Sequence, residues 1–359
     1  MSNNMTAFAD SGKVHMDLFN KLIYPYHGAP NNNLIAGPGY GVDVALIQLP
    51  GNYAMALTSD PLSWIPTLGL QESAWLSVHL MANDIATTSQ PPQFAQLVLN
   101  LPESCTSSEF ETYWMHVQQV CKEIGVTITG GHTGKAAGMQ STLAGGGTMI
   151  TVAKTDDLLL SKFAQPGDFI VVTKEAAQIA SSILALSFPD LVRSKCGQEN
   201  WKQAAALFYE TSSLQAGLCA GVINATQHSK AVTAMHDVTE GGILGAIYEM
   251  AMASGCGAFL HEDQLPIGQA QQVVCGLFSI DPYSCVGAGS MIMAVKPGRE
   301  EELLLTLQQN NIKATLVGQF TEKSEGIRMQ KKDELITLGQ PGADPYWNAF
   351  FQALKNGWK

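Results

Sequence analysis

The sequence predicts a mixed α/β protein of two domains, and three observations lead to this class. The chain has 359 residues, more than the roughly 100 to 200 that one domain usually contains. Strand-like apolar runs are interspersed with stretches of helical periodicity, in hairpins as well as crossovers. Hydrophobic residues make up 46% of the chain, charged residues 14%, and 34 residues are glycine. This composition is typical of a compact fold with many glycine-containing turns and argues against disorder.

The elements follow in chain order. "VALIQLP" and "YAMALTSDP" flank the turn residues Pro50, Gly51 and Asn52 and predict a hairpin. Further strands are predicted at "AQLVLNLP", "MITVAK", "FIVVTK" and "SMIMAVK". Helical periodicity covers residues 69–82, 109–124, 175–187, 201–225 and 242–254.

A domain boundary is indicated by the turn residues Pro166, Gly167 and Asp168, which precede a new strand. We therefore expect an N-terminal domain over residues 1–160 and a C-terminal domain over residues 161–337. Residues 338–359 read as a linker and a short aromatic helix, packed on the body of the protein or on a partner subunit.

Charge and cysteine content exclude several classes. The net charge is −11 with only 20 lysines and arginines, which disfavours a nucleic-acid partner, so an anionic ligand would need metal ions or helix ends. The seven cysteines are scattered without a CxxC motif, which indicates reduced thiols and disfavours zinc. The N-terminus lacks the pattern of a signal peptide, and no run of 18 apolar residues occurs. We expect a soluble, cytoplasmic protein without membrane contact.

Acidic residues mark the first candidate site. Asp43 and Asp60 lie almost symmetrically about the hairpin turn, so symmetric pairing would place their carboxylates side by side. Like charges in that position need a cation, and hard oxygen ligands favour Mg²⁺. Asn83 and Asp84 follow at the end of a predicted helix, where an acid opposes the helix dipole. The alternatives are solvated acids at strand ends and a frayed helix end.

Two glycine motifs could bind an anion. "ITGGHTGKAAG" lacks the spacing of a P-loop, but Gly130, Gly131, His132 and Thr133 could form a backbone-rich loop. In "MHDVTEGGILGAIYEMA", Asp237 and Glu240 form a capping-box pattern at the start of a helix. Each glycine in the first turn costs roughly 1 kcal/mol of helix propensity. Capping explains the acids, whereas a bare helix start for a phosphate explains the glycines, and both interpretations stay open.

In chain order, the motifs "GPGYGVDVALI", "TSDP", "HLMANDIATTSQPP", "GGHTG", "QPGDFIVVTK" and "HDVTEGGILGAIYEMA" resemble those of the aminoimidazole ribonucleotide synthetase (PurM-like) superfamily. The resemblance spans roughly Gly12 to Met329. It is closest to the HypE-like group, usually labelled AIR synthase-related. Thiamine-monophosphate kinase, selenophosphate synthetase and formylglycinamidine synthase are other members of the superfamily.

The resemblance implies a PurM-like fold in which two N-terminal domains form an intersubunit β-barrel on dimerisation, beside a C-terminal α/β sandwich. It implies ATP in a cleft near that interface. Mg²⁺ would be held by Asp43, Asp60, Asp84 and Asp237, of which the last three are the candidate catalytic residues. The residues implied around the nucleotide are Asn83, Gly130, Gly131, His132, Thr133, His236, Thr239, Glu240, Gly241 and Gly242.

The sequence departs from the family pattern in ways that weaken some assignments. Relatives often carry an acid where this chain has Val42, an acid in the loop around His132, and a Gly-Ala turn where this chain has Ser89-Gln90. Selenophosphate synthetase needs a reactive cysteine near its N-terminus, and HypE modifies a cysteine at its C-terminus. Here the first cysteine is Cys105 and the last is Cys285, so both of these activities are disfavoured.

Two functions from different classes remain. The first is ATP- and Mg²⁺-dependent phosphorylation or activation of a small molecule at an amide, carbonyl or phosphate group, by an enzyme of the kinase, ligase or synthetase type. The second is a catalytically weakened, nucleotide-binding accessory or regulatory protein with a protein partner. The second rests on Val42, the acid-free glycine loop and the aromatic C-terminal helix.

Overall fold

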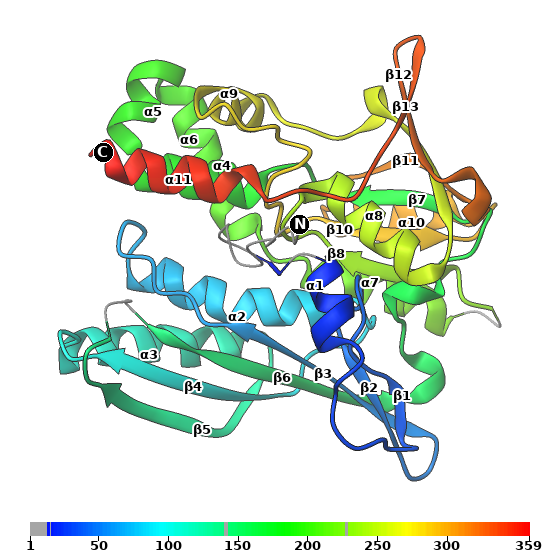
Figure 1. The fold of residues 1–359 in the computed structure, drawn as a ribbon, viewed down its shortest axis with the longest axis horizontal. Helices are drawn as coiled ribbons and strands as arrows, with labels where there is room; N and C mark the ends of the chain where they lie inside the picture. The colour runs from blue at the N-terminus through cyan, green and yellow to red at the C-terminus, as the bar shows by residue number, and fades with distance from the viewer. Residues whose placement is uncertain (1–12, 15, 140–142, 227–228) are drawn as a thin grey trace, which may run out of the picture.

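The computed structural model describes residues 13–14, 16–139, 143–226 and 229–359. Gly12, where the family resemblance begins, lies outside these residues. The described chain forms two β-sheets, with helices packed between and around them (Figure 1). Near the N-terminus, the short helical turns Met16–Leu18 (α1) and Phe19–Ile23 precede the first sheet.

The first sheet has six strands in the order β1-β2-β3-β6-β4-β5. In chain order they are β1 Leu34–Ala36, β2 Ala45–Leu49, β3 Tyr53–Pro61, β4 Phe94–Pro102, β5 Thr127–Ala136 and β6 Ala144–Lys154. The predicted hairpin is confirmed, since β2 and β3 pair antiparallel with Leu49 opposite Tyr53. β5 forms one edge of the sheet and pairs parallel with β4.

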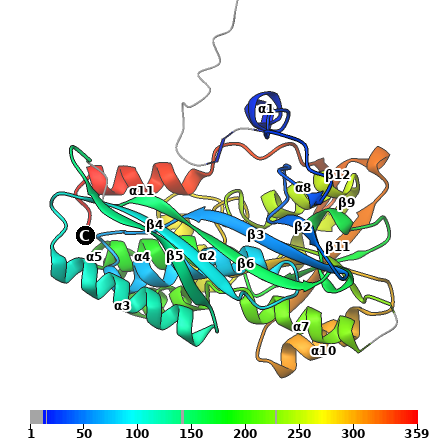
Figure 2. The same cartoon turned by 90° about the horizontal axis from the view of Figure 1, so that it is seen from below.

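Helices α2 (Leu70–Ala86) and α3 (Ser107–Glu123) pack on one face of this sheet. Alternate residues of each strand point toward these helices, as Ala54 and Ala56 do, and the residues between them point to the other face. That other face exposes Tyr53, Phe94 and Val98. Seen from below, strands β3, β4 and β6 lie in front of α2 without a covering helix (Figure 2).

The second sheet has seven strands in the order β13-β12-β9-β11-β7-β10-β8. In chain order they are β7 Phe169–Thr173, β8 Val232–Asp237, β9 Gly257–His261, β10 Met291–Val295, β11 Ala314–Thr321, β12 Ile327–Lys331 and β13 Glu334–Thr337. Helices α7 (Leu214–Ala225) and α10 (Glu300–Gln309) share one core with the sheet, and α8 (Gly242–Ser254) shares another. Every residue of β8 and β10 is buried, as expected for strands covered on both faces.

A layer of helices completes the second half of the chain and also contacts α2. Its members are α4 Gln178–Ser187, α5 Pro189–Cys196, α6 Gln198–Ala206, α9 Gln269–Leu277 and α11 Pro345–Lys355. These helices share a core that includes Leu76 of α2, so α2 lies between the first sheet and this layer (Figure 1). Tyr346 and Phe350 of α11 are buried there, so the C-terminal helix packs on the body of the protein.

Four of the five predicted helices are confirmed within a few residues, as α2, α3, α4 and α8. The prediction of one helix over 201–225 is wrong, because it is divided into α6, a short 3₁₀ turn at Leu207–Glu210 and α7. The Asn83 side chain bonds the carbonyl of Thr211 and the N–H of Ser213, and these bonds replace helical ones at the break. Among the described residues, no helix is both long and apolar enough to cross a membrane.

Candidate carboxylate site

Four predicted acids from both halves of the chain meet at one place. Asp60 lies near the end of β3, Asp84 in the last turn of α2, and Asp237 at the end of β8. Asp43 lies just before β2. Burial raises the pKa of Asp84 well above its ordinary value, and the negative charges of the other three acids add to this effect. The four acids therefore lie close enough to influence one another electrostatically.

The detailed geometry of Asp43 and Asp60 differs from the prediction. In the hairpin, Ala45 faces Leu57, and this register carried on toward Asp43 leads to Ser59 and not to Asp60. Asp60 instead faces Gly147 of β6. Burial raises the pKa of Asp60, Lys13 lowers it, and the charge of Asp43 raises it further. The two acids therefore still interact. The cluster arises from the convergence of several elements and not from one cross-strand pair.

His236 organises the buried part of the cluster. Its Nδ1 atom lies 2.6 Å from Oδ1 of Asp43, and its Nε2 atom lies 3.1 Å from Oε2 of Glu249. Burial alone would lower the pKa of His236, but these two carboxylates raise it to about 10. The imidazolium therefore holds Asp43 in place. This arrangement leaves neither ring nitrogen free for the nucleotide contact predicted for His236.

The donor atoms fit a divalent cation. One carboxylate oxygen of Asp43 and one of Asp237 lie within 4.8 Å of each other, whereas His236 beside them has both ring nitrogens paired with carboxylates and would not ligate the ion. Oδ2 of Asp43 and Oδ2 of Asp237 are buried, and neither has a hydrogen-bond partner in the described part of the chain. Burial and the charge of Asp43 raise the pKa of Asp237 to about 7. Unpaired buried carboxylate oxygens are costly unless a cation binds them, and Mg²⁺ prefers such oxygen ligands.

Lys13 is a member of the site that the sequence did not indicate. Its Nζ donates to Oγ1 of Thr239 at 2.8 Å and lies 3.8 Å from Oε2 of Glu249. Burial would lower its pKa, but Glu249, Asp237 and the other acids raise it above the ordinary value. Lys13 and Thr239 are 226 residues apart in the chain, so no local pattern could have connected them.

The predicted capping box at the start of α8 is wrong. The helix begins at Gly242 with Gly241 as its N-cap and no side-chain cap, because Asp237 still belongs to β8. Gly242 has φ 64°, and a Cβ there would lie 2.5 Å from the carbonyl oxygen of Tyr283. The N–H of Gly241 donates to Oδ2 of Asp344 at 2.8 Å. A carboxylate of the protein itself thus accepts from the helix start, where a phosphate was one of the two open interpretations.

Asn83 is a structural residue in this fold. It is fully buried, its Nδ2 donates to the carbonyl of Thr211 at 3.0 Å, and its Oδ1 accepts from the N–H of Ser213 at 2.7 Å. The amide connects α2 to the start of α7, and the contact between Asn83 and a nucleotide stays a prediction. The alternative of a frayed end of α2 is wrong because of this connection.

The predicted glycine loop is part of a strand. Gly130, Gly131, His132 and Thr133 lie within β5, the exposed edge of the first sheet. Gly131 faces Leu97, Leu97 faces Gly147, and Gly147 faces Asp60. Three strand spacings place Gly131 about 14 Å from Asp60. Within this chain, the glycine segment does not join the acids.

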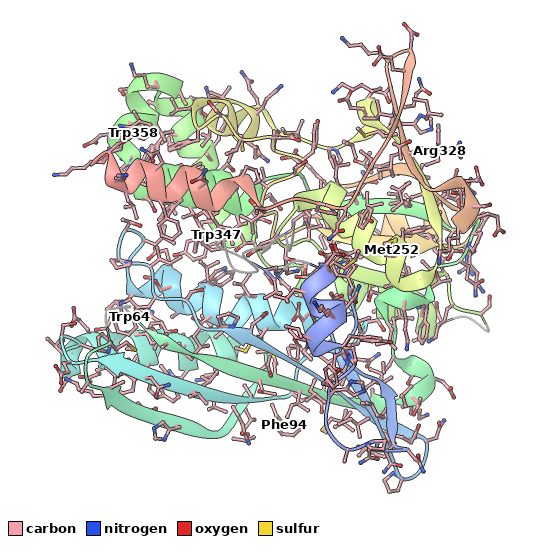
Figure 3. The ribbon with its side chains drawn as sticks, viewed as in Figure 1. Trp64, Phe94, Met252, Arg328, Trp347 and Trp358 are labelled. Carbon is pink, nitrogen blue, oxygen red and sulfur yellow. The ribbon has the colours of Figure 1, made fainter. Side chains whose placement is uncertain are left out.

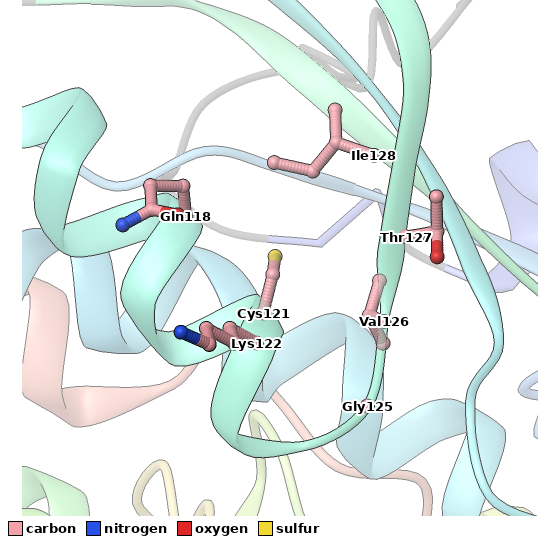
Figure 4. Close-up of a pocket in the computed structure, with 7 residues that line it drawn as sticks. All are labelled: Gln118, Cys121, Lys122, Gly125, Val126, Thr127 and Ile128. Carbon is pink, nitrogen blue, oxygen red and sulfur yellow. The ribbon is translucent and has the colours of Figure 1, made fainter.

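Among the described residues, two surface cavities have walls that do not include the acids. One of about 470 Å³ lies between the end of α3 and the start of β5, and Figure 4 shows Gln118 and Lys122 on one side and Thr127 and Ile128 on the other. The other, of about 170 Å³, lies under the segment that precedes α11 and includes Gly241 in its wall.

The fold and the site define a two-domain α/β protein whose halves contribute acids to one carboxylate cluster. A family model described as AIR synthase related protein, N-terminal domain, matches residues 41–153, and one described as AIR synthase related protein, C-terminal domain, matches residues 165–330. The chain belongs to the AIR synthase-related family, within the PurM-like superfamily and its HypE-like group.

Individual relatives agree with this assignment. A hydrogenase expression/formation protein of Methanocaldococcus jannaschii is 24% identical over 75% of this chain and 76% of its own length. Thiamine-monophosphate kinase of Haemophilus influenzae is 24% identical over 79% of this chain and 83% of its own. A crystal structure of the hydrogenase maturation protein HypE in complex with ATP superposes with a TM-score of 0.65 at 18% identity, over 92% of this chain and 96% of that one.

Proposed function

We propose that this protein binds ATP with Mg²⁺ at the carboxylate cluster and phosphorylates or activates a small molecule. The observation that carries the proposal is the pair of buried, unpaired oxygens of Asp43 and Asp237 in a group of four acids. Support comes from the relatives, which include a kinase and a protein crystallised with ATP. The substrate group that fits this chemistry is an amide, a carbonyl or a phosphate oxygen.

The roles of the side chains follow from their contacts. Asp43 and Asp237 would bind Mg²⁺, and Asp60 and Asp84 would add negative charge close by. The bound ion would neutralise the phosphate groups and polarise the phosphoryl group that is transferred. His236 orients Asp43, and Thr58 donates from Oγ1 to Oδ2 of Asp84 at 2.5 Å. Catalysis at such a site consists mainly of positioning and charge neutralisation.

The open face of the first sheet supports a homodimer. Tyr53, Phe94 and Val98 are each about 40% exposed or more, on strands without a covering layer. In Figure 3, Phe94 lies on the lower side of the sheet, away from the helices. Exposed apolar residues on an uncovered sheet face are typical of a protein interface. The proposed occupant is the same face of a second copy, which is also how a barrel of strands from two subunits would form.

The compartment is inferred from the thiols. All seven cysteines are free, and six of them are buried. This pattern favours a reducing compartment, and we place the protein in the cytoplasm on that ground.

The metal assignment is tested with Asp60→Asn. This change removes one charge from a crowded group of acids, so we expect unchanged or increased thermal stability. Mg²⁺-dependent binding of a non-hydrolysable ATP analogue should weaken by at least about tenfold, as measured by isothermal titration calorimetry. Asp263→Asn, at an exposed acid away from the cluster, is the matched control. Equal affinities of the two variants would refute the assignment.

A specific observation favours the second function. Val42 stands next to Asp43 where relatives often carry an acid, and β5 brings no acid to the cluster. A site that binds the nucleotide with Mg²⁺ yet supports no turnover with any amide, carbonyl or phosphate acceptor would indicate the accessory protein. The aromatic residues of α11 no longer support that function, because α11 packs on the body of the chain.

A further inference from the structure

Glu240 accepts hydrogen bonds from both ends of the chain. The backbone N–H of Lys13 donates to its Oε2 at 2.7 Å, and the indole N–H of Trp347 donates to its Oε1 at 3.0 Å. Each carboxylate oxygen therefore has one donor, and the two donors are 334 residues apart in sequence. Glu240 lies in the loop between β8 and α8, three residues after the site acid Asp237.

The C-terminal side of this contact is firmly anchored. Oδ1 of Asp344 accepts from the N–H of Tyr346 at 2.9 Å and caps α11, while its Oδ2 accepts from the N–H of Gly241. Tyr346 and Phe350 are buried, and the ring of Phe350 lies 5.5 Å from that of Phe188. Trp347 lies one residue after Tyr346, on the side of α11 nearer the first sheet (Figure 3). The indole N–H is therefore presented by a fixed helix.

The N-terminal side has no comparable anchor in the core. Among the described residues of the segment, none of 16–23 is buried, and Leu22, Ile23 and Tyr24 are exposed. The start of the segment is held instead by the polar contacts of Lys13. Its N–H bonds Glu240, and its Nζ bonds Thr239 and pairs with Glu249. These contacts place the ammonium group beside the carboxylate cluster.

We propose that Glu240 is a positioning residue through which helix α11 holds Lys13 at the carboxylate site. The proposal rests on the proposed function in one respect, that the cluster is where the ligand binds. We call the Trp347–Glu240–Lys13 contacts the clasp. The hydrogen bond from the Trp347 indole fixes the carboxylate of Glu240, and the fixed carboxylate accepts from the N–H of Lys13. Loss of the indole bond frees the carboxylate to rotate, and Lys13 leaves the site more often.

Trypsin measures this opening without any nucleotide. The side chain of Lys13 is exposed, but cleavage needs an unbound, extended backbone at this residue, whose N–H is bonded to Glu240. Trp347→Phe removes the indole N–H and keeps a ring to stack on Phe351. We expect the fragment beginning at Val14 to appear about fivefold faster than in the wild type, the factor for one lost hydrogen bond. Mass spectrometry follows the fragment, and cleavage at other lysines should keep its wild-type rate.

Two further variants make the outcome decisive. Trp358→Phe changes a tryptophan of the same C-terminal region that packs near Phe278 and makes no contact with Glu240, and it should leave the cleavage rate unchanged. Glu240→Gln offers one acceptor to two donors and should also accelerate cleavage after Lys13. Wild-type rates in both Trp347→Phe and Glu240→Gln would overturn the proposal. So would an equal increase at all tryptic sites, which would indicate general destabilisation.

Failure of the clasp and failure of the proposed function are distinguishable. If the wild type binds no nucleotide but Trp347→Phe is still cleaved faster after Lys13, the clasp stands and the ATP site does not. If the wild type binds nucleotide tightly and only with metal, but Trp347→Phe is cleaved after Lys13 at the wild-type rate, the ATP site stands and the clasp does not. If both the clasp and the ATP site are correct, bound Mg²⁺ and ATP analogue should slow cleavage after Lys13 more in the wild type than in Trp347→Phe.

Discussion

At the scale of single residues, Gly242 shows how packing can explain a costly glycine. Its φ of 64° and the carbonyl oxygen 2.5 Å from a virtual Cβ account for the residue without any ligand. Gly241 has φ 83°, and its N–H donates a hydrogen bond to Asp344. The motif therefore supports the site indirectly, by turning the chain sharply between Asp237 and α8.

The packing role of Gly242 predicts a measurable loss of stability. Gly255→Ala is the matched control, since Gly255 has φ 68° and its Cβ would meet nothing within 4 Å, and the strained backbone should cost roughly 1–2 kcal/mol. Gly242→Ala adds a clash with the backbone of Tyr283 and should cost roughly 1–3 kcal/mol more. Urea unfolding measures both. Equal losses of unfolding free energy in Gly255→Ala and Gly242→Ala would show that the contact between the new Cβ and the carbonyl of Tyr283 is relieved at no cost.

At the scale of elements, helix α2 links the site to the rest of the fold. It presents Asp84 to the acids, Asn83 to the break before α7, and Trp75 and His79 to the segment around Tyr209. The rings of Trp75 and His79 lie 3.8 Å apart. Burial, with a smaller effect of Lys174, lowers the pKa of His79 to about 4.

This shift predicts a pH dependence of stability. Because the folded pKa of about 4 lies below the ordinary value of 6.5, the unfolded chain binds the proton more tightly. Stability is therefore lost as pH falls from 6.5 to 4, by up to about 3 kcal/mol. His79→Phe keeps an aromatic ring beside Trp75 and should remove this part of the loss, whereas His27→Phe, at an exposed histidine, should not. Parallel pH profiles of His79→Phe and wild type in urea unfolding would contradict the expectation.

The elements also show what the sequence could predict. The hairpin, α2, α3 and α8 follow from local periodicity and turn residues, and the acids of the site follow from the ordered motifs. The glycines of β5 favour a loop because glycine disfavours strands, whereas the pairing of β5 with β4 is a tertiary interaction that local sequence does not indicate. No local pattern indicates Lys13 or Asp344, because their partners lie 226 and 103 residues away in the chain.

At the scale of the whole molecule, the uncovered face of the first sheet predicts the assembly. Phe94→Glu places a charge in the middle of the proposed interface, where burial without a partner is costly. We expect a dimeric wild type and a monomeric variant in sedimentation velocity experiments. Met252→Glu, on the exposed side of α8, is the control and should stay dimeric (Figure 3). A Phe94→Glu protein that stays dimeric would show that another surface forms the interface.

In the proposed function, acids from both halves of the chain bind Mg²⁺ and ATP together. Calorimetric titration of the wild-type protein with a non-hydrolysable ATP analogue, with and without Mg²⁺, tests it most directly. We expect binding with Mg²⁺ that is lost when the metal is removed and weakened in Asp60→Asn. Absence of binding in both conditions would contradict it, and the carboxylate cluster would then be a structural feature of the fold.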